Sequence, residues 1–207
     1  EAKKFNKVDK DWIKLMQKSS ETMNVVACCN NELLRNSLPV LYAELEKCQK
    51  SLEGYLEQKR NKFPRFYFVS NPVLLLILSQ GSDPLQMQPY YEKVFDSISQ
   101  VVHDKADKSL IKKFKAISGK EEEVIPLYKD VKAIGNIEDW LTTLEDSMQK
   151  SMKNLCETAA ATCSNNLKEF VDASCGQFAL LGVQFNWTLQ CQTALEKCKT
   201  SKGIMSD

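Results

Sequence analysis

The segment Tyr55–Gln80 decides the architecture of this chain, and its sequence is YLEQKRNKFPRFYFVSNPVLLLILSQ. A helical pattern gives way to an aromatic run at residues 63–69 and then to an apolar block at residues 73–78. Pro64 disfavours helical geometry at the residue before it, so the first helix ends there. A segment that changes its hydrophobic period twice over so short a distance has to be buried from several sides. We therefore predict a rigid joint between two helices.

The far side of this joint begins at Asn71 and Pro72, a pair typical of a helix N-cap followed by proline in the first turn. Arg65 lies among aromatic residues, where its guanidinium is exposed, stacked on a ring or paired with a carboxylate. We favour a structural arginine that fixes the corner between the helices, with a direct contact to a part of the protein outside this segment as the alternative. The residues predicted to form the joint are Phe63, Pro64, Arg65, Phe66, Tyr67, Phe68, Leu74, Leu75, Ile77 and Leu78.

Two helices are expected before the joint. Residues 3–19 place apolar side chains at helical spacing, and residues 30–61 carry a heptad seam of mostly leucine residues. Pro39 predicts a kink or a new helix start within the second of them. A seam of this length needs a partner helix.

After the joint, residues 90–102 again show helical spacing. Residues 110–117 and 124–128 are short apolar runs on either side of a polar loop that contains glycine, which predicts a β-hairpin. Pro126 confines the second strand of this hairpin to a sheet edge.

The C-terminal third is predicted to be helical. Asn136 is expected as an N-cap, the apolar face continues to residue 171, and Gly176 interrupts it. The packing residues expected here are Trp140, Leu141, Leu144 and Trp187. The predicted fold is mainly α, an elongated helical bundle of long helices with one small β-hairpin near 110–128, in three segments, 1–62, 63–135 and 136–207.

Composition narrows the classes of partner. The 207 residues carry a net charge of +1, so the chain has no long-range field that attracts nucleic acid or an anionic membrane, and neither is a predicted partner. The apolar run 73–78 is far shorter than the roughly 20 residues that cross a bilayer. The sequence opens at Glu1 without the pattern of a signal peptide, so we expect a piece of a longer protein.

No catalytic, cofactor-binding or metal-binding residue is predicted. The eight cysteines include no Cys-x-x-Cys pair, and one histidine cannot complete the usual zinc ligand sets. Reduced, mostly structural thiols are the favoured interpretation, with redox-active Cys191 or Cys198 as the alternative. The sequence has no phosphate-binding Gly-x-x-x-x-Gly-Lys motif, and residues 118–120 are interpreted as a solvated turn.

Three further charged features have a structural interpretation. We expect His103 to be an exposed or capping residue at a helix end, and residues 121–123, three glutamates, to be a solvated charge run. Four lysines are expected to solubilise the hairpin, with contact to an acidic protein surface as the alternative. They are Lys112, Lys113, Lys115 and Lys120.

The segment that begins at Tyr55 resembles the linker region of dynein heavy chains. The matching pattern is Tyr-Leu-Glu-x-Lys-Arg-x-x-Phe-Pro-Arg-Phe-Tyr-Phe-Val-Ser-Asn-x-x-Leu-Leu-x-Ile-Leu-Ser. Within it, residues 68–71 resemble the axonemal branch more than the cytoplasmic one. Further matches lie at residues 82–84, 88–89, 95–96, 98, 135–141, 144–145, 148, 176–177 and 185–188.

This resemblance implies a mechanical lever, the C-terminal part of the linker, which precedes the first AAA+ module. It implies transmission of ATP-driven conformational change for microtubule-based movement, with no catalysis and no cofactor in this segment. The implied partners are the AAA+ ring of the same heavy chain, the dynein tail and its associated chains indirectly, and the microtubule through the whole motor. The implied location is cytoplasmic and cytoskeletal, in the axoneme of a cilium or flagellum. A spectrin-like helical scaffold or tether and a redox-sensing cysteine protein stay open as alternatives.

Overall fold

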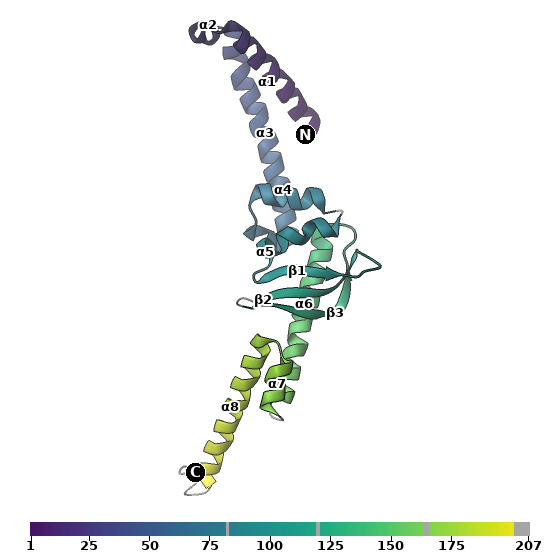
Figure 1. Ribbon diagram of the computed structural model, residues 1–207. Coiled ribbons are helices and arrows are strands. Elements are labelled where there is room, and N and C mark those ends of the chain that lie inside the picture. The colour runs from purple at the N-terminus through teal and green to yellow at the C-terminus, as the bar shows by residue number, and fades with distance from the viewer. Residues whose placement is uncertain (82, 119–120, 164–165, 201–207) are drawn as a thin grey trace. The chain divides into compact units, whose positions relative to one another are not determined.

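The computed structural model describes residues 1–81, 83–118, 121–163 and 166–200. Within these ranges the chain forms eight α-helices, two 3-10 helices and three β-strands (Figure 1). The fold is mainly α, as predicted. The chain divides into two compact units, residues 1–64 and 65–207.

The first unit is a helical hairpin. Helices α1 (Ala2–Thr22) and α3 (Glu32–Lys62) lie side by side and are connected through the short α2 (Val25–Cys29) (Figure 1). Helix α1 is thus a partner for the heptad seam of α3. No new helix begins at Pro39, which lies inside α3. Proline removes one backbone donor, but the apolar seam continues on both sides of it, and packing against α1 favours a single helix.

Local capping explains the turn between these helices. Met23 ends α1 in the left-handed conformation, with φ of 50°. The side chain of Asn24 accepts a hydrogen bond of 3.1 Å from the amide of Ala27, and that of Asn31 accepts one of 3.0 Å from the amide of Leu33. Each asparagine satisfies a donor that has no partner within its own helix.

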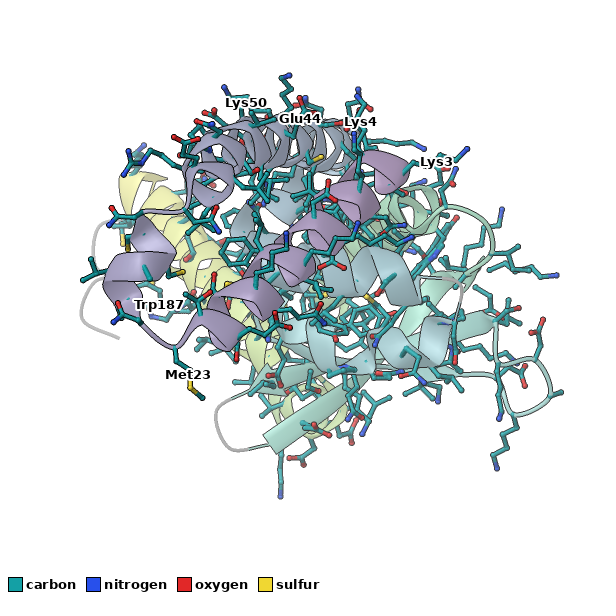
Figure 2. The ribbon with its side chains drawn as sticks, turned by 90° about the horizontal axis from the view of Figure 1, so that it is seen from above. Lys3, Lys4, Met23, Glu44, Lys50 and Trp187 are labelled. Carbon is teal, nitrogen blue, oxygen red and sulfur yellow. The ribbon has the colours of Figure 1, made fainter. Side chains whose placement is uncertain are left out.

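Charged side chains follow the exposed edge of the hairpin. Lys4 of α1 and Glu44 of α3 lie at the same edge (Figure 2). Lys47 lowers the pKa of Glu44 through a hydrogen bond of 2.8 Å, and Lys4 adds to this effect. Ion pairs between exposed side chains such as these contribute little to the stability of the fold.

The aromatic segment is a short 3-10 helix, η1 (Pro64–Phe68), and it leads into α4 (Asn71–Gln80) and η2 (Pro84–Tyr90). The predicted N-cap is wrong by one residue, because Ser70 holds the extended cap position and Asn71 is already helical. Pro72 lies in the first turn as expected. Proline is tolerated there because the first amides of a helix have no helical acceptor.

The predicted helix over residues 90–102 is wrong for most of its length. Only α5 (Tyr91–Val94) is α-helical, Ser97 adopts a φ of 60°, and β1 (Ile98–His103) follows. The β-branched residues of β1 suit a strand as well as a helix, and pairing with a neighbouring strand decides between them.

Three strands form one antiparallel sheet in the order β1-β2-β3, with β2 (Leu110–Ser118) in the centre and β3 (Glu121–Lys132) at an edge. The predicted hairpin is therefore confirmed, but β1 completes a sheet that the sequence did not indicate. Pro126 lies on the edge strand, as predicted, where a missing backbone donor is tolerated.

Strand β3 carries a bulge opposite β2. Ile111 pairs with Val131 but Lys113 pairs with Pro126, so residues 127–130 of β3 lie opposite a single residue of β2. Backbone groups in such a bulge lose their ladder partners and need others.

The C-terminal part contains three helices, α6 (Ile137–Thr162), α7 (Leu167–Ala173) and α8 (Gly176–Thr200). Helix α6 packs on β3 along its N-terminal half and on α8 near its C-terminus, and α7 also packs on α8 (Figure 1). The break at Gly176 is confirmed. A single helix continuing to residue 171 is not observed, because α6 ends at Thr162.

A small core explains this early end. Cys163, Phe170 and Phe178 are buried together with Ala159, which requires the chain to turn back so that α7 and α8 meet the end of α6. Gly182 allows the close approach, because a Cβ atom there would clash with the ring of Phe170. A straight helix would leave Phe170 without this contact.

The larger core lies between the sheet and α6. Its members are buried apolar residues of β1, β2, β3 and α6, namely Val101, Ile111, Phe114, Ile125, Val131, Trp140, Leu141, Leu144 and Met148. Trp187 was predicted to be a packing residue, but its side chain is 67% exposed. None of the helices in the described ranges combines the length and apolar character needed to cross a membrane.

Candidate functional site: the aromatic segment and helix α6

Arg65 connects the aromatic segment to two other parts of the second unit. Its Nε donates a hydrogen bond of 2.7 Å to Oε1 of Glu145 on α6. Its guanidinium carbon lies 5.0 Å from the centre of the Phe95 ring, directly after α5. The guanidinium of Arg65 is therefore both paired with a carboxylate and stacked on a ring, which are two of the three environments predicted for it. The side chain therefore fixes η1 against α6, at a separation of 80 residues in the sequence.

The predicted joint residues fall into two groups. The buried or half-buried ones are Phe63, Arg65, Phe66, Leu74, Leu75, Ile77 and Leu78, and the exposed ones are Pro64, Tyr67 and Phe68. The expectation of burial from several sides is therefore wrong for Phe68, which is 79% exposed. A 3-10 helix has about three residues per turn, so residues at a spacing of three share a face. Phe63, Phe66 and Val69 follow that spacing and are all buried.

Two serines of α6 attach the bulge of β3, and we call this contact the serine clasp. Ser147 Oγ donates a hydrogen bond of 2.6 Å to the Lys129 carbonyl and accepts one of 3.3 Å from the Lys129 amide. Ser151 Oγ accepts a hydrogen bond of 2.7 Å from the Tyr128 amide. Both serines are buried. The clasp supplies partners for backbone groups that the bulge removes from the ladder.

Sequence reasoning missed the serine clasp, although a signal for it exists. Ser147 and Ser151 are four residues apart on the same face of α6 as Leu144 and Met148. Polar residues on an apolar helical face are buried only when they find hydrogen-bond partners. The spacing therefore indicates a contact, but it does not identify the strand.

Two glutamates of β3, Glu122 and Glu123, make specific contacts, which corrects the expectation that they form only a solvated charge run. The side chain of Glu121 lies outside the part of the chain that the structure describes. Glu123 Oε1 accepts a hydrogen bond of 2.7 Å from the backbone amide of Gly176 and so caps α8. Glu122 pairs with Lys115 at 3.2 Å, and this lysine together with Ser99 lowers the pKa of Glu122. The carboxylates therefore tie the sheet to α8 and to its own neighbouring strands.

The lysines of β2 are partly neutralised. Lys112 forms an ion pair with Asp104, which raises the pKa of Lys112 and lowers that of Asp104, while Lys115 pairs with Glu122. Lys113 is exposed, and Lys120 lies outside the described residues. These pairs leave a weaker basic patch than the sequence suggests.

Burial shifts the pKa values of His103 and of Tyr91. His103 ends strand β1 and is half-buried, so its predicted place at a helix end is wrong, and burial lowers its pKa. The Tyr91 side chain is fully buried, which raises the pKa of its hydroxyl. In both cases removal from water disfavours the charged form.

All eight cysteines are free thiols. Cys163 is buried, Cys29 is exposed, and Cys191 and Cys198 are half-buried. Burial, followed by the charge of Glu123, raises the pKa of Cys175. In the part of the chain that the structure describes, no group of three or more histidine, cysteine or acidic residues has a metal-binding arrangement.

Comparison with known proteins identifies the family of this chain. Residues 1–159 match the family model described as dynein heavy chain, N-terminal region 2. The chain belongs to the dynein heavy chain family. The matched region of this dynein segment contains the aromatic segment, the sheet and most of α6, and thus both Arg65 and the serine clasp.

Individual relatives cover almost the whole dynein segment. It is 44% identical over 210 residues to dynein axonemal heavy chain 5 of Rattus norvegicus, covering 99% of this chain and 6% of the relative. It is 40% identical over 209 residues to the dynein gamma chain of the flagellar outer arm of Chlamydomonas reinhardtii, covering 100% and 5%. It is 33% identical over 170 residues to cytoplasmic dynein 2 heavy chain 1 of Caenorhabditis elegans, covering 82% and 4%. The chain thus spans about one-twentieth of the length of these relatives.

Proposed function

We propose that this dynein segment is a mechanical lever, the C-terminal part of a linker, which transmits conformational change of an AAA+ ring to the rest of the motor. In this proposal its partners are the AAA+ ring of the same heavy chain, the tail and its associated chains indirectly, and the microtubule through the complete motor. The segment contributes no catalytic group, and the ATPase modules lie elsewhere in the heavy chain. Nothing in the described residues favours the spectrin-like scaffold instead.

The observation that supports a lever most strongly is the set of contacts around α6. Arg65 joins the aromatic segment to α6, the serine clasp joins β3 to α6, and Glu123 joins β3 to α8. A part that transmits force must resist deformation, and contacts between elements far apart in sequence provide that resistance. These contacts are the kind that the proposal requires of the second unit.

The identities to axonemal and flagellar outer-arm chains indicate a place in the axoneme of a cilium or flagellum. This agrees with the axonemal character of residues 68–71. The motor that contains this segment is accordingly proposed to act in ciliary or flagellar movement.

Two phenylalanines of the aromatic segment provide a matched test in the complete heavy chain. Phe66 is fully buried and Phe68 is 79% exposed. Phe66→Ala removes a core contact worth about 3–5 kcal/mol, so we expect ATP hydrolysis to persist while microtubule gliding slows. Phe68→Ala serves as the control and should leave gliding unchanged. Normal gliding with Phe66→Ala, at a normal rate of hydrolysis, would count against the lever.

A further inference from the structure

A groove of about 730 Å³ lies in the second unit, where η1, the sheet, α6 and the start of α8 meet. Its apolar lining includes Phe95, Phe114, Ile125, Met148, Met152 and Phe178. A volume of this size accommodates several side chains. The two methionines make the lining adaptable in shape, because their side chains are unbranched and flexible. We call this feature the α6 groove.

The charged residues of the α6 groove are mostly acidic. Three carboxylates, Asp96, Glu123 and Glu145, line it together with one guanidinium, Arg65. Arg65 is paired with Glu145, and Glu123 faces the N-terminal amide of α8. Asp96 is exposed at the rim. The α6 groove therefore combines an apolar lining with a net negative charge.

We propose that the α6 groove receives a segment of the same heavy chain, outside these 207 residues, in which aliphatic side chains stand next to lysine or arginine. Aliphatic side chains match the lining, and a cation matches the acidic rim. About nineteen-twentieths of each relative's length lies outside the region matched here, so most of the parent chain is available as an occupant. Covalent connection raises its effective concentration, and a modest groove then suffices. This inference does not depend on the lever role.

Photo-cross-linking in the complete heavy chain tests the occupant directly. Gln149 is exposed, lines the groove and lies on α6, so Gln149→benzoylphenylalanine places a photoreactive group at its rim. We expect irradiation to produce cross-links within the same heavy chain, to a peptide that contains lysine or arginine beside aliphatic residues. Asp146→benzoylphenylalanine is the control, because Asp146 is exposed on α6 but does not line the groove.

Charge variants make the test specific to the acidic rim. Asp96→Lys should lower the yield of the cross-link from position 149 by roughly threefold or more, and Asp146→Lys should not change it. The proposal is overturned if position 149 forms no cross-link, if the product is a separate polypeptide, if the captured peptide is acidic, or if the two charge variants act equally. Circular dichroism of both variants verifies that the helices are retained.

Discussion

Gly182 is a residue at which α8 passes close to the ring of Phe170. A Cβ atom at this position would lie 3.2 Å from Cβ of Cys163 and closer still to the Phe170 ring, which is itself buried. Glycine inside a helix ordinarily costs about 1 kcal/mol relative to alanine. Here that cost is offset by the close approach of two helices.

Two glycine substitutions separate these effects. Gly182→Ala should lower the free energy of unfolding by about 1–2 kcal/mol, because overpacking outweighs the gain in helix propensity. Gly54→Ala in α3, where nothing beyond the adjoining backbone of the helix lies within 4 Å of the added Cβ, should raise it by about 1 kcal/mol. Chemical denaturation of both variants checks the prediction. A stabilising Gly182→Ala would contradict the packing of α8 described here.

His103 is the single histidine of the chain, so a change in the free energy of unfolding at about pH 6 can be assigned to it. Burial lowers its pKa in the folded state below the unperturbed value of about 6.5. In the window between these two values the unfolded state binds more protons, so the free energy of unfolding falls as the pH is lowered through about 6.5. We expect the imidazole proton resonances to titrate with a midpoint below that value. A midpoint at or above about 6.5 would be inconsistent with the half-buried position, and His103→Gln should abolish the stability change in this window.

At the scale of elements, the serine clasp is the polar contact that joins the bulge of β3 to α6. Ser147→Ala leaves the amide and carbonyl of Lys129 without this partner, which should cost about 1–3 kcal/mol. Hydrogen exchange at the Lys129 amide should accelerate accordingly. Thr158→Ala is the control on the same helix, because its exposed hydroxyl bonds only the Asn154 carbonyl of its own helix. Equal exchange in the two variants would show that the clasp does not hold the bulge.

The bulge and the clasp depend on each other. Strand β3 diverges from β2 over residues 127–130, and α6 presents Ser147 and Ser151 at the same place. Without the serines the part-buried amides of Tyr128 and Lys129 would lose these acceptors, and without the bulge Ser147 would lose both of its bonds to Lys129. Because of this reciprocity we expect the sheet and α6 to move as one block in the proposed lever.

At the scale of the whole molecule, several large apolar side chains remain exposed on both units. On α8 they are Leu180, Leu181, Phe185, Trp187 and Leu189. Apolar surface of this kind is typical of a region that contacts other protein. The chain covers only about one-twentieth of its relatives' length, and we propose that the rest of a longer heavy chain supplies such contacts.

Two tryptophans test this distribution of exposed surface in the 207-residue chain. Trp187 is 67% exposed and Trp140 is 3% exposed. Trp187→Phe should remove the fluorescence that acrylamide quenches most readily, whereas Trp140→Phe should remove emission that is poorly quenched. If the two variants change quenching alike, α8 is covered in solution by a contact absent from the structure.

The sequence by itself determined the elements that rest on local rules. Heptad spacing gave α3, the Asn71-Pro72 pair gave the start of α4 to within one residue, and Pro126 gave the edge strand. The ordered matches around Tyr55–Gln80 indicated the family. These features depend mainly on neighbouring residues, and their local preferences agree with the final fold.

Only the tertiary structure decided how these elements meet. Residues 98–103 became a strand because β2 offered a pairing partner, and Phe68 remained exposed because the 3-10 turn directs it away from the core. Arg65 reached Glu145, and Glu123 reached Gly176, across separations of 80 and 53 residues. Periodicity specifies which face of an element is apolar but not what covers that face. Contacts over such distances are therefore fixed by packing of the whole unit, which no local pattern encodes.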